Sequence, residues 1–231
     1  MKKSIIILLT YFSLIAANIY SQQFQFGIES GIGTYQMSAL KSTNSDIQKG
    51  IPFDTKLVSN FPAYFYYRPT VELVFKHFGI GLNYSFLSTG SRISGKDYSG
   101  EYNFDMLIHS NTPSIFGEYY LNPDNKFPIS FYLNFGRYYT TLNIKEHFSL
   151  GDSTLTNNYE NYKAQNFYTE PGMKIYYPYK SFRIGFDIGY ALQFSGKGFY
   201  LNNNINQKMA DSKIPNWSGF RIGISLIYNL K

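Results

Sequence analysis

The chain contains no cysteine and few charged residues, and both absences narrow its possible functions. Without cysteine there is no disulfide framework, no thiolate metal site and no attachment point for a lipoprotein anchor. Charged residues make up 16% of the 231 positions, and the formal net charge is +6. The basic residues are scattered rather than clustered, which argues against a nucleic-acid partner. The sequence therefore gives no indication of a metal, a cofactor or a nucleic-acid ligand.

Long apolar runs are also absent beyond the N-terminus. Ile5–Ile19 is apolar but too short to anchor a chain stably across a bilayer, and two lysines precede it. We interpret residues 1–21 as a cleavable signal peptide that ends at Ser21, and residues 22–231 as the mature chain. Cleavage removes both lysines and lowers the net charge to +4 (6 − 2). The alternative is a retained N-terminal anchor helix.

Aromatic residues are abundant, with 23 Tyr and 21 Phe, and such an excess favours strands over helices. Apolar and small or polar residues alternate with a period of two, most cleanly over Phe182–Phe194. In that stretch every even position is apolar, while the odd positions are mostly glycine, charged or polar. A helix would scatter the same residues around its surface. The pattern thus predicts an all-β protein.

Eight segments carry this alternation, and the connections between them alternate in length. The expected strands are Phe24–Gly33, Phe65–Phe75, Phe78–Phe86, Tyr102–Leu121, Ile129–Gly136, Phe167–Tyr177, Phe182–Phe194 and Phe220–Leu230. Short turns are expected near Lys76–His77, Asn122–Pro128 and Pro178–Ser181, and long polar loops near Ser38–Asn60, Gly90–Gly100, Asn143–Gln165 and Ser195–Asn216. Short turns on one rim and long loops on the other are typical of transmembrane barrels. We predict an eight-stranded antiparallel up-and-down β-barrel formed by one domain.

The two faces of these strands differ in chemistry. One is large and apolar, as lipid requires, and the other is rich in glycine and short polar side chains, as a narrow lumen permits. The alternative is a soluble periplasmic barrel that binds an apolar ligand inside. That alternative requires Phe182, Ile184 and Phe186 in the interior. A structure therefore decides between the two interpretations.

Three stretches resemble a known family. The segment NTPSIFGEYYLNPDNKFPISFYLNFGRYY, from Asn111, is similar to a recurring segment of the Bacteroidetes-type outer-membrane β-barrel domain, the PorT-like small barrels, with Pro113 and Tyr119–Tyr120 at matching places. PGMKIYYPYKSFRIGFDIGYALQF resembles its sixth and seventh strands, and FRIGISLIYNLK its last strand. The chain departs from many such barrels by ending in Leu230–Lys231 rather than in an aromatic residue. The resemblance implies an outer-membrane location and lipid as a partner, and it implies no reaction.

The inward-facing rows collect five acidic and four basic side chains. They are Glu29, Arg68, Glu72, Glu118, Glu170, Lys174, Arg183, Asp187 and Arg221. Unpaired charge in a narrow interior is costly, so we expect the arginines to pair with the carboxylates and plug the lumen. The alternatives are a gated path for ions, as in a narrow porin-like barrel, and carboxylate catalysis.

The long loops are the expected place for binding, because loops on a rigid scaffold often carry recognition. Aromatic residues stand there among polar ones, and the candidates for the outer rim are Phe148, Tyr159, Tyr162, Phe199 and Tyr200. Other envelope proteins are the partners that such loops would contact. His147, close to Ser149 and Asp152, suggests a lipid-modifying enzyme as the alternative. We expect a structural or interaction role without catalysis.

Two features do not fit the pattern. Arg137 falls on the lipid-facing parity of its strand, where it either snorkels to the rim or follows a bulge. Pro69 and Pro171 lie within strands, where proline removes a ladder hydrogen bond.

Overall fold

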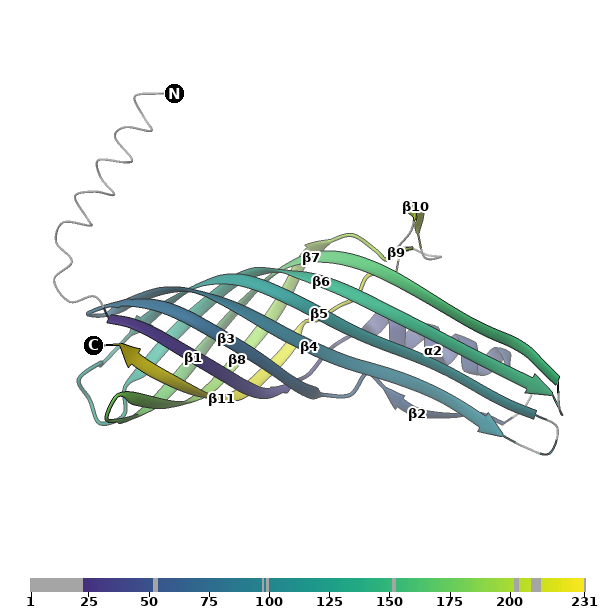
Figure 1. The fold of residues 1–231 in the computed structure, drawn as a ribbon, viewed down its shortest axis with the longest axis horizontal. Helices are drawn as coiled ribbons and strands as arrows, with labels where there is room; N and C mark the ends of the chain where they lie inside the picture. The colour runs from purple at the N-terminus through teal and green to yellow at the C-terminus, as the bar shows by residue number, and fades with distance from the viewer. Residues whose placement is uncertain are drawn as a thin grey trace, which may run out of the picture.

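The computed structural model describes residues 23–51, 54–96, 98, 100–150, 153–201, 204–208 and 213–230, so the expected signal peptide lies outside the described residues. Eight strands form a closed antiparallel ring (Figure 1). They are β1 (Gln23–Gly33), β3 (Tyr64–Phe75), β4 (Phe78–Lys96), β5 (Gly100–Tyr120), β6 (Ile129–Leu150), β7 (Ser153–Tyr179), β8 (Phe182–Gly196) and β11 (Gly219–Leu230). Each pairs with its neighbour in the chain, and β11 closes the ring against β1. The predicted eight-stranded barrel is confirmed.

The apolar face of the barrel points outward. Phe182, Ile184 and Phe186 are 42%, 46% and 51% exposed, whereas Asp187 beside them is 1% exposed. Exposed tyrosines stand towards both ends of this apolar belt, Tyr119 and Tyr228 on the side of the short turns and Tyr64 and Tyr139 on the side of the protruding strands, as in the aromatic girdles of membrane barrels. This arrangement rules out the soluble barrel with an apolar interior.

Two of the expected long loops are instead continuations of strands. β4 and β5 stay paired as far as Lys96 and Glu101, and β6 and β7 as far as Leu150 and Ser153. The expectation of loops at Gly90–Gly100 and Asn143–Gln165 was therefore wrong. These stretches lack apolar alternation because their outer face is not lipid-facing, yet backbone pairing continues without it. We call residues 88–96, 100–109, 141–150 and 153–163 the protruding sheet.

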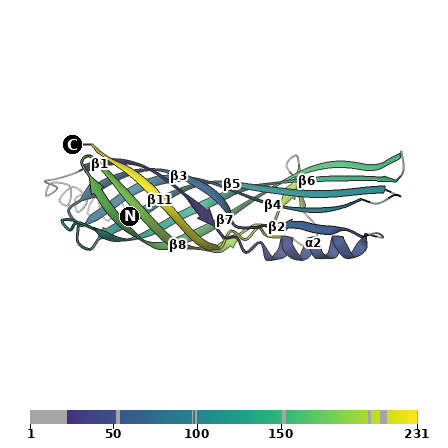
Figure 2. The same ribbon diagram turned by 90° about the horizontal axis from the view of Figure 1, so that it is seen from below.

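The first long segment was also expected to be a loop, and most of it is regular structure. It contains α2 (Ser38–Gly50) and the short strand β2 (Lys56–Asn60), which pairs with the edge of β4. α2 runs beneath the protruding sheet (Figure 2), where Leu40 and Ile47 pack into an apolar cluster with Ile93 and other side chains of the sheet. Burial of this stripe stabilises a helix that carries no side-chain cap.

The fourth long segment contains two short strands, β9 (Tyr200–Leu201) and β10 (Asn204–Lys208), of which β9 pairs with β7 at Tyr162 and Lys163. Residues 213–218 then lead back to β11, and Trp217 within them contacts Thr140 of β6 and Tyr35 after β1. Among the described residues, no helix has the length and apolarity needed to cross a membrane.

Candidate functional site

Two regions gather polar side chains, and the first is the lumen. All nine charged residues expected there point inward; Arg183 is half-buried and the other eight are buried. They come from β1, β3, β5, β7, β8 and β11, whose alternating parity brings them into one interior. Strand register, rather than any local motif, assembles this cluster.

Arg68 is the centre of the first ion-pair group. Its Nη1 and Nη2 donate to both carboxylate oxygens of Glu170 at 2.7 and 2.8 Å, and Nη1 also reaches Glu29 at 3.3 Å. The Nε donates to Ser85 at 2.9 Å. The fork of the guanidinium is therefore satisfied in the planar, bidentate geometry that arginine favours.

Lys174 is the centre of the second group. Its Nζ lies 3.4 Å from Asp187, 3.8 Å from Glu118 and 3.9 Å from Glu29, and 4.9 Å from the ring centre of Tyr132. Glu29 thus links the lysine to Arg68. The sequence placed Lys174 in the lumen but did not assign it the pairing role that it has.

The expected pairing of Arg183 and Arg221 with carboxylates was wrong. Arg183 donates to Gln25 and lies over the ring of Tyr176 at 4.8 Å. Arg221 donates to the carbonyls of Thr34 and Trp217, both at 2.8 Å. Neither arginine has a carboxylate within 4.0 Å among the described residues. The two guanidinium groups lie near the two ends of the barrel, where an aromatic face and backbone carbonyls contact them in place of carboxylates.

Trp217 closes the lumen beside the protruding sheet. It is fully buried, its indole Nε1 donates to Thr140 at 2.9 Å, and its ring meets Tyr35 edge-on at 5.0 Å. Below it the rings of Tyr138 and Tyr168 stack at 4.3 Å. Alternation could not indicate this lid, because Trp217 lies outside the alternating strands; its only signal in the sequence is that it is the single tryptophan of the chain.

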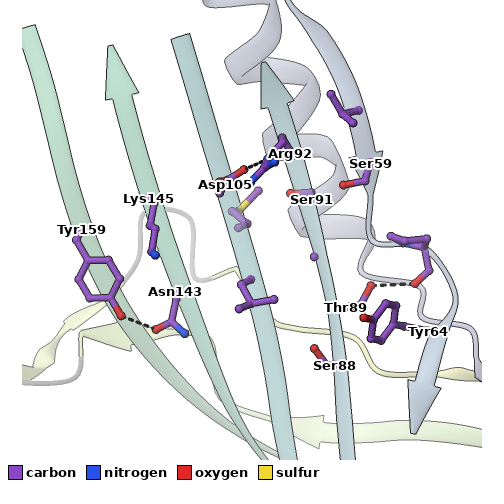
Figure 3. A pocket seen from close by; sticks show the side chains of 15 residues that line it. Ser59, Tyr64, Ser88, Thr89, Ser91, Arg92, Asp105, Asn143, Lys145 and Tyr159 are labelled. Carbon is purple, nitrogen blue, oxygen red and sulfur yellow. Dashed lines mark hydrogen bonds and ion pairs between the residues drawn. The ribbon is translucent and has the colours of Figure 1, made fainter. Parts of the chain in front are cut away.

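The second region is a depression on the outer face of the protruding sheet, with a volume of about 900 Å³ (Figure 3). It forms because Ser88 and Gly90 give β4 little outward bulk. Beside them the chain turns at Phe61, where φ is 50°, and separates β2 from β3. The depression thus results from the small side chains of β4 together with the break in the edge strand.

A cross-strand row crosses this depression. Arg92, Asp105, Lys145 and Tyr159 lie directly opposite one another on β4, β5, β6 and β7. Arg92 binds Asp105 with both arms of its fork at 2.6 and 2.8 Å, and these hydrogen bonds raise the pKa of the guanidinium above its usual value. Lys145 has no carboxylate within 4.0 Å among the described residues and lies 5.9 Å from the ring of Tyr159. The row offers one neutralised pair, one available cation and one aromatic face.

The five aromatic residues expected at the rim have different positions. Tyr159 lines the depression, and its hydroxyl donates to Asn143 at 3.1 Å. Tyr162 donates to Glu160, and partial burial together with this hydrogen bond raises its pKa to about 12. Phe148 packs against the ring of Tyr102 on the α2 side. Phe199 is fully buried, so its expected exposure was wrong, and Tyr200 is half-buried in β9.

Two of the three residues of the enzymatic alternative lie on β6. His147 lies opposite Asn103 and Asn157 on β6, and Ser149 is two positions further along the same strand. Asp152 lies outside the described residues. Within the described ranges, no three His, Cys, Asp or Glu side chains are placed to hold a metal ion.

No protein-family model and no curated protein sequence matches the chain. Several solved structures match it in fold. A major outer membrane protein from Thermus thermophilus superposes with a TM-score of 0.54 at 11% identity, over 91% of this chain and 100% of that one. Neisserial surface protein A gives 0.43 at 6% identity, over 91% and 100%. Ail of Yersinia pestis, solved with the heparin analogue sucrose octasulfate, gives 0.41 at 12% identity, over 90% and 97%. The first of these matches, with the closed ring and its apolar outer belt, shows that the chain has the fold of an outer-membrane β-barrel.

Proposed function

We propose that this protein is a non-catalytic outer-membrane barrel that displays the protruding sheet to another envelope protein. The observation that carries the proposal is the cross-strand row of Arg92, Asp105, Lys145 and Tyr159 over an open depression. Tyrosine and arginine are enriched at protein recognition surfaces, and charged groups around them orient the partner. Export through a cleaved signal peptide at residues 1–21 and membership of the PorT-like small barrels belong to the same proposal.

The lumen supports a structural role over an ion path. Charged groups fill its middle, held by Arg68 and Lys174, and the rings around Trp217 fill its upper end. An eight-stranded barrel has an interior that side chains alone can fill. We therefore propose a plugged lumen that does not conduct.

The recognition surface is tested by photocrosslinking in cells that express the full chain. A photoreactive amino acid at Tyr159 should give a discrete adduct with one envelope protein, because this side chain is 60% exposed over the depression. Lys145→Glu should lower the adduct yield about threefold, the effect of losing an exposed charge contact of somewhat under 1 kcal/mol.

The matched control places the photoreactive group at Lys49, which is exposed on α2 at the other side of the sheet. Adducts at Lys49 but not at Tyr159 would contradict the proposed surface. If Lys145→Glu left the adduct yield at Tyr159 unchanged, the charged row would not be part of the recognition surface.

A further inference from the structure

The lipid-facing belt contains one charged side chain among the described residues, and its surroundings point to a ligand. Arg137 lies on the outward face of β6 among apolar neighbours, as its parity predicted, and no bulge interrupts its register with β7. A charged side chain facing hydrocarbon is expensive unless it reaches water or an anion.

None of the contacts that Arg137 makes with described residues neutralises its positive charge. Nη2 donates to Gln165 at 2.5 Å, and the guanidinium lies 5.0 Å from the ring of Phe167 and 5.3 Å from that of Tyr139. Its Nε is buried without a hydrogen-bond partner, and no described carboxylate lies within 4.0 Å of it. The group is held in place, and its Nη1, which makes no hydrogen bond to a described residue, is left for an anion.

A groove of about 720 Å³ starts at Arg137 and runs across the outer face of β6, β5, β4, β3 and β1. Its floor is low because two prolines, Pro69 and Pro113, stand where larger side chains stand elsewhere on the belt. Pro113 faces Tyr84 in the ladder of β4 and β5. Phe26, Tyr84 and Phe135 are among its walls. The strand proline Pro69, which removes a ladder bond, thus serves to shape this groove.

The groove runs obliquely through the belt. Its β1 end, at Phe26, lies within the half of the belt nearer the short turns, whereas Arg137 lies towards the protruding sheet. One end is thus apolar and deep in the belt, and the other is cationic and close to its outer edge. That is the polarity of a single membrane lipid.

We propose that this groove binds an anionic phospholipid, with an acyl chain over Pro69 and Pro113 and the headgroup phosphate on Arg137 and Gln165. Arginine and phosphate form charge-assisted, often bidentate hydrogen bonds, which are stronger where water is scarce. The site depends on the barrel being in a membrane, but not on the protein partner proposed above.

Native mass spectrometry of the purified full chain in detergent tests the site with two added lipids of the same acyl chains, dioleoylphosphatidylglycerol and dioleoylphosphatidylethanolamine. The wild type should retain one phosphatidylglycerol about tenfold better than the zwitterionic lipid, the strength of one charge-assisted contact. Arg137→Gln should abolish this preference. Lys145→Gln removes the same charge from the same strand outside the groove and should leave the preference intact.

Pro69→Phe tests the acyl end, since a ring there fills the groove without touching Arg137. It should lower retention of the dioleoyl lipid several-fold while dihexanoylphosphatidylglycerol binds as it does to the wild type. Heat-modifiable gel mobility confirms that each variant is folded. Equal retention of both headgroups by the wild type, or an unchanged preference in Arg137→Gln, would show only a nonspecific lipid shell and overturn the proposal.

Discussion

Tyrosine hydroxyls complete the hydrogen bonding of the buried carboxylates. Tyr66 donates to Glu29 at 2.5 Å, Tyr120 to Glu72 at 3.0 Å and Tyr176 to Glu118. A fourth hydroxyl, that of Tyr132, lies 3.4 Å from Glu170. Buried charges are tolerated when they are paired and hydrogen-bonded, and here each glutamate has a phenol beside it. The aromatic excess of the chain therefore serves the lumen as well as the lipid-facing surface.

Removing one partner of the ion pair between Arg68 and Glu170 should destabilise the barrel strongly, whereas replacing both partners by apolar residues should destabilise it little. Arg68→Ala leaves the buried Glu170 without its cation and Glu29 with Lys174 alone, and it should lower the free energy of unfolding by about 3–5 kcal/mol. Replacing both residues by methionine should recover most of that loss. Arg183→Ala should cost less than Arg68→Ala, because Arg183 has no carboxylate within 4.0 Å among the described residues and is less buried. The stabilities of the wild type and these three variants are compared by the temperature at which each barrel loses its heat-modifiable gel mobility.

Single-channel conductance of the same variants examines the plug. The wild type should pass almost no current, and Arg68→Ala should show intermittent openings. Steady wild-type conductance combined with an unchanged unfolding temperature in Arg68→Ala would overturn the plug.

At the scale of elements, the protruding sheet and the barrel meet different solvents along the same strands. On β6, for example, outward Phe131, Leu133 and Phe135 give way to Asn143 and Lys145. Backbone pairing continues across this change, because ladder hydrogen bonds do not depend on which side chains face out. The sheet is therefore a rigid extension of the barrel rather than a set of loops.

The tip of the β6–β7 hairpin should be dispensable for folding. His147 and Asn157 pair directly, so replacing residues 148–156 by Asn-Gly closes the shortened hairpin with a favoured two-residue turn. We expect a change of about 1 kcal/mol in the free energy of unfolding, since Phe148 is the one described residue of the removed part that packs against the apolar cluster. Deleting only Asn157–Lys163 removes one side of the ladder and serves as the contrast.

Gel mobility and protease resistance of the two deletion variants test whether the hairpin is an ordered part of the sheet. The matched deletion should behave as the wild type, and the one-sided deletion should be cleaved within β6. Equal resistance of both would mean that the hairpin is not ordered as a sheet.

At the scale of the whole molecule, the two rims should face opposite sides of the membrane. The short turns, the start of β1 and the end of β11 lie at one end of the barrel and the protruding sheet at the other (Figures 1 and 2). Because the chain has no cysteine, single cysteines at Ser153 and Asn125 report each rim cleanly. A membrane-impermeant maleimide added to intact cells should label Ser153→Cys and leave Asn125→Cys unlabelled until the outer membrane is opened. Labelling of Asn125→Cys alone would reverse the orientation.

The alternation of side chains was enough to predict the strands from β1 to β11 that form the ring, and which charges share the interior. Period-two patterning fixes the face of each residue once a strand is assigned, so Glu29, Arg68 and Asp187 could be placed inside without coordinates. The same reasoning failed for Gly90–Gly100 and Asn143–Gln165, where no apolar face marks the strands. It also failed for α2, whose stripe of Leu40 and Ile47 is too short to stand out.

By itself the sequence determined the fold class and which residues share the apolar row and which the charged row, because these depend on parity along single strands. The structure decided that the apolar row faces outward. Only the tertiary structure decided which charges pair, that Trp217 covers the lumen, and that Arg137 borders a groove shaped by Pro69 and Pro113. Those contacts depend on the stagger between strands distant in the chain. Stagger is set by closure of the whole ring, and no local pattern encodes it.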